Sequence, residues 1–158
     1  MKKYLPFIML IITLATILVF SSQSGNQSNG ISNRIANKIE IFLDAQGNNS
    51  YNAEDINFVI RKLAHFTEYL ILTILLIVCC SYFLRRVLLT LLISSIVGVS
   101  LAFIDEYFQR SSGGRTSSLF DIMIDSFGVL IGIIIGGVFM VYFKQILLNE
   151  NKVDDFKK

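Results

Sequence analysis

The chain has 158 residues, of which 53% are hydrophobic and 16% charged, and its formal net charge at pH 7 is +2. A mean hydropathy of +0.61 is too high for an ordinary soluble domain of this length, so the composition indicates a single domain within a membrane. The small net charge and the absence of any nucleic-acid-binding motif argue against a nucleic acid as partner. The two cysteines, Cys79 and Cys80, are adjacent in an apolar run, which suits neither a disulfide framework nor a metal cage.

The first apolar run covers residues 4–20 and follows Lys2 and Lys3. Its length is at the short limit for a helix that crosses a membrane. A basic start, an apolar stretch and small residues after it are also typical of a signal peptide. This run is long for a signal peptide and lacks an Ala-x-Ala cleavage site, so we expect an uncleaved transmembrane helix.

A polar loop over residues 21–60 follows the first helix. Within it, Ile31, Ile35 and Ile39 recur at helical spacing, and polar residues occupy the other positions. This pattern predicts an amphipathic helix. The helix would either lie in the membrane interface or pack on the outer ends of the spanning helices.

Three further apolar stretches predict three further transmembrane helices, at residues 61–84 (or from Asp55), 87–109 and 119–143. The connection at Arg85 and Arg86 is so short that the second and third helices must be antiparallel neighbours. An outer loop over residues 110–118 precedes the fourth helix, and a charged tail over residues 144–158 follows it. We therefore expect an all-α membrane protein, a compact bundle of four transmembrane helices with an interfacial amphipathic helix in its first outer loop.

Basic residues near the helix ends predict the orientation in the membrane. With both termini in the cytoplasm, the cytoplasmic side carries Lys2, Lys3, Arg85, Arg86, Lys144, Lys152, Lys157 and Lys158. The outer side carries the smaller set, Arg34, Lys38, Arg61, Lys62, Arg110 and Arg115. The sequence thus predicts a multi-pass protein with both termini cytoplasmic.

Strong polar side chains from three helices and one loop gather at the predicted outer end of the bundle. They are Arg61, His65, Glu68, Asp105, Glu106, Gln109, Arg115, Asp121 and Asp125. The uncharged part of each helix is shorter than the roughly 20 residues that cross the hydrocarbon, so the charged turns must enter the nonpolar layer or thin it. Charges this close to lipid are costly and predict a functional site. The alternative is a structural network in which the acidic and basic side chains neutralise one another.

Helical spacing assigns these side chains to faces. Arg61, His65 and Glu68 are four and three residues apart and share one stripe of the second transmembrane helix. In the fourth helix, Asp121 and Asp125 also lie four residues apart. The same side continues through Gly128, Gly132 and Gly136.

This glycine series is the small-xxx-small pattern that lets helix backbones approach closely in a membrane. It predicts that the aspartates of the fourth helix face a neighbouring helix rather than lipid. The same glycine side is a candidate face for a homo-oligomer.

Several segments, in this order, resemble the VanZ-like family of bacterial membrane proteins. They are residues 21–25 (SSQSG), 61–69 (RKLAHFTEY), 105–109 (DEYFQ), Gly114-Arg115 and the series Asp121, Asp125, Gly128. The resemblance extends from the first helix through the fourth, although Gly113-Gly114-Arg115 stands where the family commonly has Pro-Gly-Arg. It implies a multi-pass protein of the bacterial cytoplasmic membrane, whose namesake is linked with resistance to the glycopeptide teicoplanin. It implies no settled chemistry.

Three functions fit these residues. In the first, an envelope protein binds a polar lipid headgroup or a lipid-linked cell-wall component at the outer end, where Arg115 would hold a phosphate or carboxylate. In the second, an intramembrane enzyme acts on an envelope lipid with His65 or Glu68 as base and a divalent cation at the aspartates. The chain has only one histidine and no nucleophile elbow, P-loop or zinc motif, which weighs against this. The third is a structural or partner-binding protein with no ligand. We favour the first, which names no catalytic residue and needs no cofactor.

Overall fold

The computed structural model describes residues 4–23, 25–47, 51–111 and 119–155. Its elements there are all helices: α1 (Leu5–Ser22), α2 (Gly25–Ala45), α3 (Ala53–Ser81), α4 (Val87–Ser111) and α5 (Leu119–Asp155). Four of them, α1, α3, α4 and α5, are long and apolar enough to cross a membrane. The predicted fold class is therefore confirmed: an all-α protein with four candidate spans and one additional amphipathic helix.

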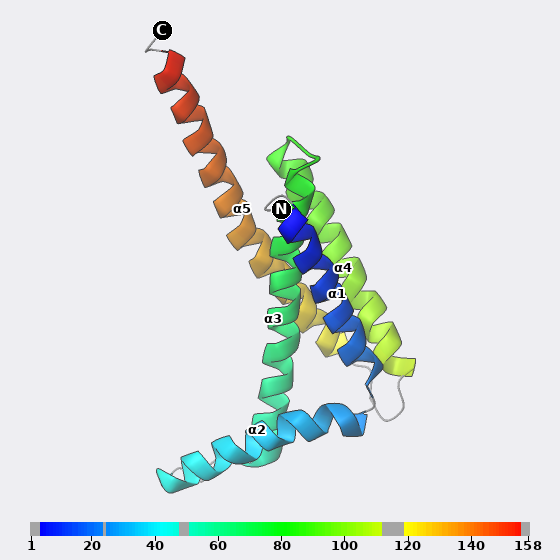
Figure 1. Ribbon diagram of the computed structural model, residues 1–158. Helices are drawn as coiled ribbons and strands as arrows, with labels where there is room; N and C mark the ends of the chain where they lie inside the picture. Colours follow the sequence, from blue (N-terminus) through cyan, green and yellow to red (C-terminus); the bar gives the residue numbers. More distant parts are fainter. Residues whose placement is uncertain (1–3, 24, 48–50, 112–118, 156–158) are drawn as a thin grey trace.

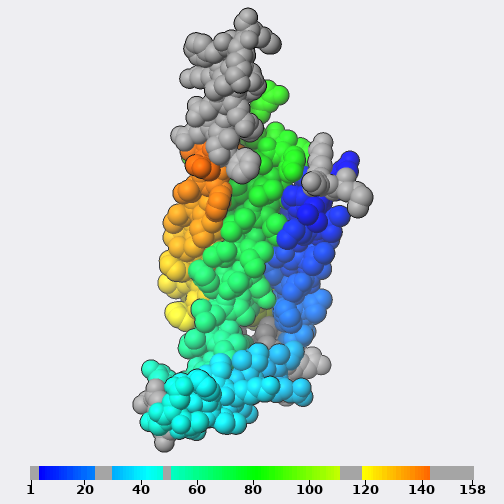
Figure 2. Space-filling model, turned by 60° about the vertical axis from the view of Figure 1, so that its left-hand side comes forward, coloured from blue at the N-terminus to red at the C-terminus, as the bar shows by residue number. Residues whose placement is uncertain are grey.

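The four long helices run side by side, and α2 lies across one end of them (Figure 1). Figure 2 shows α2 covering the ends of α1 and α3 from a second side. The start of α1, the connection between α3 and α4 and the last turns of α5 lie toward the opposite end. Helix α3 is central, because it contacts each of the other four helices. We call the end covered by α2 the α2 end.

Local capping explains where the helices begin and end. Helix α3 begins at Ala53, close to the earlier of the two predicted starts, because the Asn52 side chain accepts a hydrogen bond from the Asp55 amide (2.9 Å). Such a cap satisfies a backbone donor at the helix start, which hydropathy does not reveal. Helix α2 ends near Gly47, whose φ of 79° is the left-handed conformation that favours glycine after a helix. Helix α5 continues past the predicted end at residue 143 to Asp155.

The core of the bundle surrounds Tyr69 of α3. Tyr69 and Leu72 are completely buried, together with Ala102 of α4 and Val129 of α5. The Tyr69 hydroxyl donates a hydrogen bond to the Leu101 carbonyl of α4 (3.1 Å). A buried tyrosine usually needs such an acceptor for its hydroxyl, so this bond fixes how α3 and α4 are rotated toward each other.

The glycines of α5 pack against α3 of the same chain. A Cβ atom added at Gly128 would lie 2.5 Å from the Phe66 carbonyl oxygen, and one at Gly132 would lie 2.8 Å from the Thr73 Cβ. Only glycine permits backbones this close. The prediction that this side of the fourth span faces a neighbouring helix is confirmed. A homo-oligomer through the same glycines stays a prediction, and it would require a second copy to bind where α3 now packs.

Candidate polar site at the α2 end of the bundle

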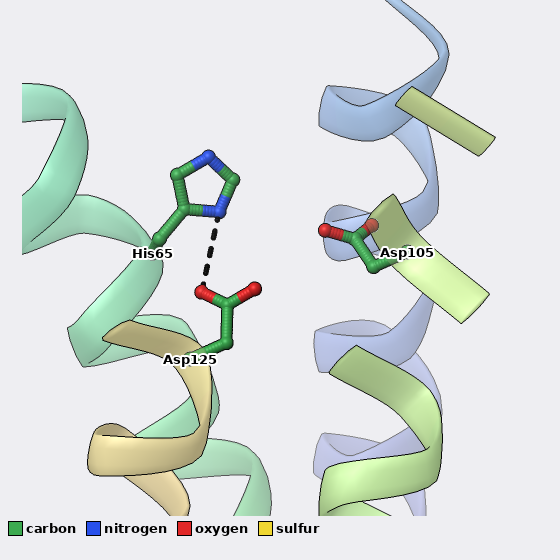
Figure 3. Close-up of side chains that lie close together, drawn as sticks. All are labelled: His65, Asp105 and Asp125. Atoms are coloured by element: carbon green, nitrogen blue, oxygen red, sulfur yellow. Dashed lines mark ion pairs between the residues drawn. The ribbon is translucent and has the colours of Figure 1, made fainter. Parts of the chain in front are cut away.

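Three helices bring His65, Asp105 and Asp125 together at the α2 end. His65 comes from α3, Asp105 from α4 and Asp125 from α5, and one nitrogen or oxygen atom from each lies within 4.8 Å of the other two. Figure 3 shows His65 and Asp125 facing each other, with the Asp105 carboxylate directed toward them from α4. We call these three residues the His–Asp–Asp cluster. Both aspartates are buried, and Asp125 is 0% exposed.

Hydrogen bonds hold Asp105 in its orientation. Its Oδ1 accepts a hydrogen bond from the Ser21 hydroxyl, and its Oδ2 accepts one from the Gln109 side-chain amide (2.6 Å). Gln109 lies one helical turn after Asp105, and both are buried. Ser21 comes from the last turn of α1, so the Asp105 carboxylate links the first span to α4.

Asp125 has no comparable support. Both of its carboxylate oxygens are buried, and neither accepts a hydrogen bond from any residue that the structure describes. His65 faces this carboxylate, and its Nδ1 lies 3.7 Å from the Asp125 Oδ1. That distance is longer than a hydrogen bond. A buried carboxylate without hydrogen bonds is costly in a folded protein, so this position requires an explanation.

Asp121 does not belong to the cluster, because it forms an ion pair with Lys62. Its carboxylate pairs with the Lys62 ammonium of α3, and Lys62 lies 5.0 and 5.7 Å from the ring centroids of Phe58 and Phe120. The two side chains are 19% and 11% exposed, so the pair is largely shielded from solvent. Thus one of the predicted site residues is neutralised inside the chain, as the structural alternative required. The Lys62–Asp121 pair does not neutralise Asp125.

A groove borders the cluster where α2 crosses α1 and α3. It has a volume of about 210 Å³, and we call it the α2 groove. The predicted stripe of α3 supplies its polar wall through Arg61, His65 and Glu68. Its apolar wall includes Phe20, Ile31 and Ile35. His65 therefore belongs both to the groove and to the His–Asp–Asp cluster.

The remaining predicted residues divide in two. Glu106 is buried on α4, beside Asp105 in the sequence. Arg115 lies outside the described residues, so its predicted role at the site stays a prediction.

Sequence reasoning missed two residues of the site. Ser21 falls in the predicted polar loop, and the feature that could have identified it is its position as the first hydroxyl after the apolar run of α1. The sequence predicts Lys62 at the outer side, as one of the basic residues that could neutralise the acidic ones, but it does not assign a partner to Lys62. The feature that could have identified Lys62 is its position one residue after Arg61. Neighbouring residues of a helix point in different directions, so Lys62 points toward α5 while Arg61 lines the groove.

Comparison with known sequences agrees with this architecture. Residues 7–140 match the sequence model of the VanZ/LLP1 family, which covers most of α1 through α5. No curated protein and no solved structure matches the chain.

Proposed function

This chain belongs to the VanZ/LLP1 family and is a multi-span membrane protein, and from that premise we propose that its α2 groove binds a polar lipid headgroup or a lipid-linked cell-wall component. The protein would act in the bacterial envelope as a binding protein. A link with teicoplanin resistance is part of the same proposal and comes from the family resemblance. The enzymatic alternative needs a cation beside the groove.

The composition of the α2 groove carries the proposal. A lipid has a charged or polar headgroup next to apolar chains, and the groove offers a matching pair of walls. Arg61 can form hydrogen bonds to a phosphate or carboxylate through its guanidinium group, while Phe20 and Ile31 provide an apolar surface beside it. Ile31 and Ile35 are also more than 40% exposed, as expected for side chains that contact lipid.

Replacing Arg61 by alanine is expected to reduce the amount of bound anionic lipid about tenfold or more. The reason is the loss of a charge-assisted hydrogen bond, which is worth about 1.5–3 kcal/mol. The measurement is mass spectrometry of the lipids that copurify with the protein in mild detergent. Arg110→Ala is the matched control, because Arg110 is exposed on α4 and does not line the groove.

The same two variants connect the groove to resistance. The wild-type protein should raise the lowest teicoplanin concentration that inhibits a susceptible bacterium, Arg110→Ala should do the same, and Arg61→Ala should not. An identical lipid profile for wild type and Arg61→Ala would contradict headgroup binding. If Arg61→Ala binds less anionic lipid as expected, but the wild-type protein does not raise the inhibitory teicoplanin concentration, only the resistance link is contradicted.

We also place both termini in the cytoplasm and the α2 end outside. Arg85 and Arg86 connect α3 to α4 at the end away from α2, and basic connections of this kind favour the cytoplasm. A cysteine at Gln46, which is exposed beside α2, should then react with a membrane-impermeant maleimide in intact cells. A cysteine at Arg85 should react only after the membrane is opened. The reverse pattern would overturn this orientation.

A further inference from the structure

We propose that His65, Asp105 and Asp125 form a binding site for a divalent metal ion of the Zn²⁺ or Mn²⁺ type. The three donors come from three different helices and converge within 4.8 Å of one another. Imidazole nitrogen and carboxylate oxygen together are ligands that both ions accept. Convergence from α3, α4 and α5 places the site where the packing of the bundle, rather than a loop, would hold the ligands.

The state of Asp125 is the second, independent observation. Its side chain is completely buried, is directed at His65, and makes no hydrogen bond to any residue in the described ranges. A carboxylate in such a place needs a positive partner or a proton. Lys62, a cation close by on α3, is paired with Asp121 instead. A metal ion between Asp125 and His65 would supply the missing positive charge.

The distances favour an ion over a direct His65–Asp125 bond. A charge-assisted hydrogen bond would be about 2.7–2.9 Å long, whereas Nδ1 and Oδ1 are 3.7 Å apart. An ion with bonds of about 2.0–2.2 Å can bridge two donor atoms up to about 4.4 Å apart, so it spans this gap. The third donor atom lies within 4.8 Å of these two.

Asp105 is already oriented as a metal ligand would be. Ser21 and Gln109 hold its two oxygens, and each carboxylate oxygen keeps a further lone pair for an ion. Hydrogen-bonded partners behind a ligand are typical of protein metal sites, because they fix the ligand's direction. A donor set of one nitrogen and two carboxylates is poor for Ca²⁺, which takes six to eight oxygens. It leaves a coordination position open, as in catalytic rather than structural zinc sites.

This inference goes beyond headgroup binding and does not depend on it. Because His65 also lines the α2 groove, an ion in the cluster would lie beside any headgroup bound there. Metal binding can nevertheless be measured on delipidated protein, so the failure of one proposal is distinguishable from the failure of the other.

The test is titration of purified, chelator-treated protein in detergent with Zn²⁺ and separately with Mn²⁺. We expect about one ion per chain by elemental analysis, and a rise in melting temperature on adding the ion. Asp125→Asn should weaken binding at least about tenfold by calorimetry, since the amide keeps the shape and loses the charge. Asp55→Asn, which changes an exposed carboxylate at the start of α3, should bind like the wild type.

Two results would overturn the site. One is wild-type protein that binds neither ion and shows no rise in melting temperature, which would leave a protonated Asp125 as the explanation of the geometry. The other is an Asp125→Asn variant that binds as tightly as the wild type. If Asp125→Asn does not fold, His65→Gln takes its place, because His65 is only half-buried and borders the groove. Unchanged binding in that variant would equally reject the proposal.

Discussion

Replacing Tyr69 by alanine is expected to lower the free energy of unfolding by about 3–5 kcal/mol, the cost of removing a buried aromatic side chain. Tyr69 is 0% exposed and belongs to the core between α3, α4 and α5. Tyr69 also packs closely against Gly128 of α5. A Cβ atom added at Gly128 would lie 3.2 Å from the Tyr69 Cβ. Loss of the ring would leave a cavity in the core, one helical turn along α3 from His65. The measurement is unfolding in mixed micelles at increasing concentrations of a denaturing detergent.

Tyr69→Phe separates packing from hydrogen bonding. It keeps the ring and removes only the hydroxyl that donates to the Leu101 carbonyl, so we expect a loss of about 1 kcal/mol. Equal losses for the alanine and phenylalanine variants would show that the ring does not organise the core. A Tyr69→Phe variant that keeps its stability but binds metal more weakly would instead show that the bond aligns α4, and with it Asp105.

Replacing Lys62 by methionine is expected to cost about 3 kcal/mol of stability, because it leaves the Asp121 carboxylate without its partner. Breaking a fully buried pair costs about 3–5 kcal/mol. We take the lower end because the Lys62 side chain is 19% exposed. The same unfolding assay measures the loss.

A double variant gives the control. Lys62→Met combined with Asp121→Leu removes both charges, and it should recover most of the stability lost in the single variant. If the two single losses simply add, the pair does not stabilise the contact between α3 and α5. Metal binding should survive in the double variant, since neither residue belongs to the His–Asp–Asp cluster.

The pair and the cluster divide the charged residues of the α2 end into two kinds. Asp121 has a basic partner and holds two helices together. Asp125, one turn further along α5, accepts no hydrogen bond from any residue that the structure describes, and it faces His65 at 3.7 Å. Two aspartates that look equivalent by spacing therefore have different surroundings. The structural explanation accounts for the first, and a bound ion or proton is needed for the second.

Most of the fold could be predicted from the sequence, because the membrane imposes simple rules. A long apolar run must form a helix to satisfy its own backbone groups, and the four such runs correspond to α1, α3, α4 and α5. The helical spacing of Ile31, Ile35 and Ile39 predicted α2. Helix ends were predicted less well, since they depend on capping and backbone hydrogen bonds. The Asn52 cap begins α3 among charged residues, where hydropathy gives no signal for a helix.

For the site, helix direction and residue position along each span were enough to predict from the sequence by itself that His65, Asp105 and Asp125 lie at one end. The sequence also determined the Arg61–His65–Glu68 stripe and the packing of the glycine side of α5, both of which follow from helical spacing. Only the tertiary structure decided the partners: Lys62 with Asp121, Ser21 with Asp105, and His65 facing Asp125. Partners depend on how far each helix is rotated and how closely it packs, and the contacts of all the helices set those quantities together.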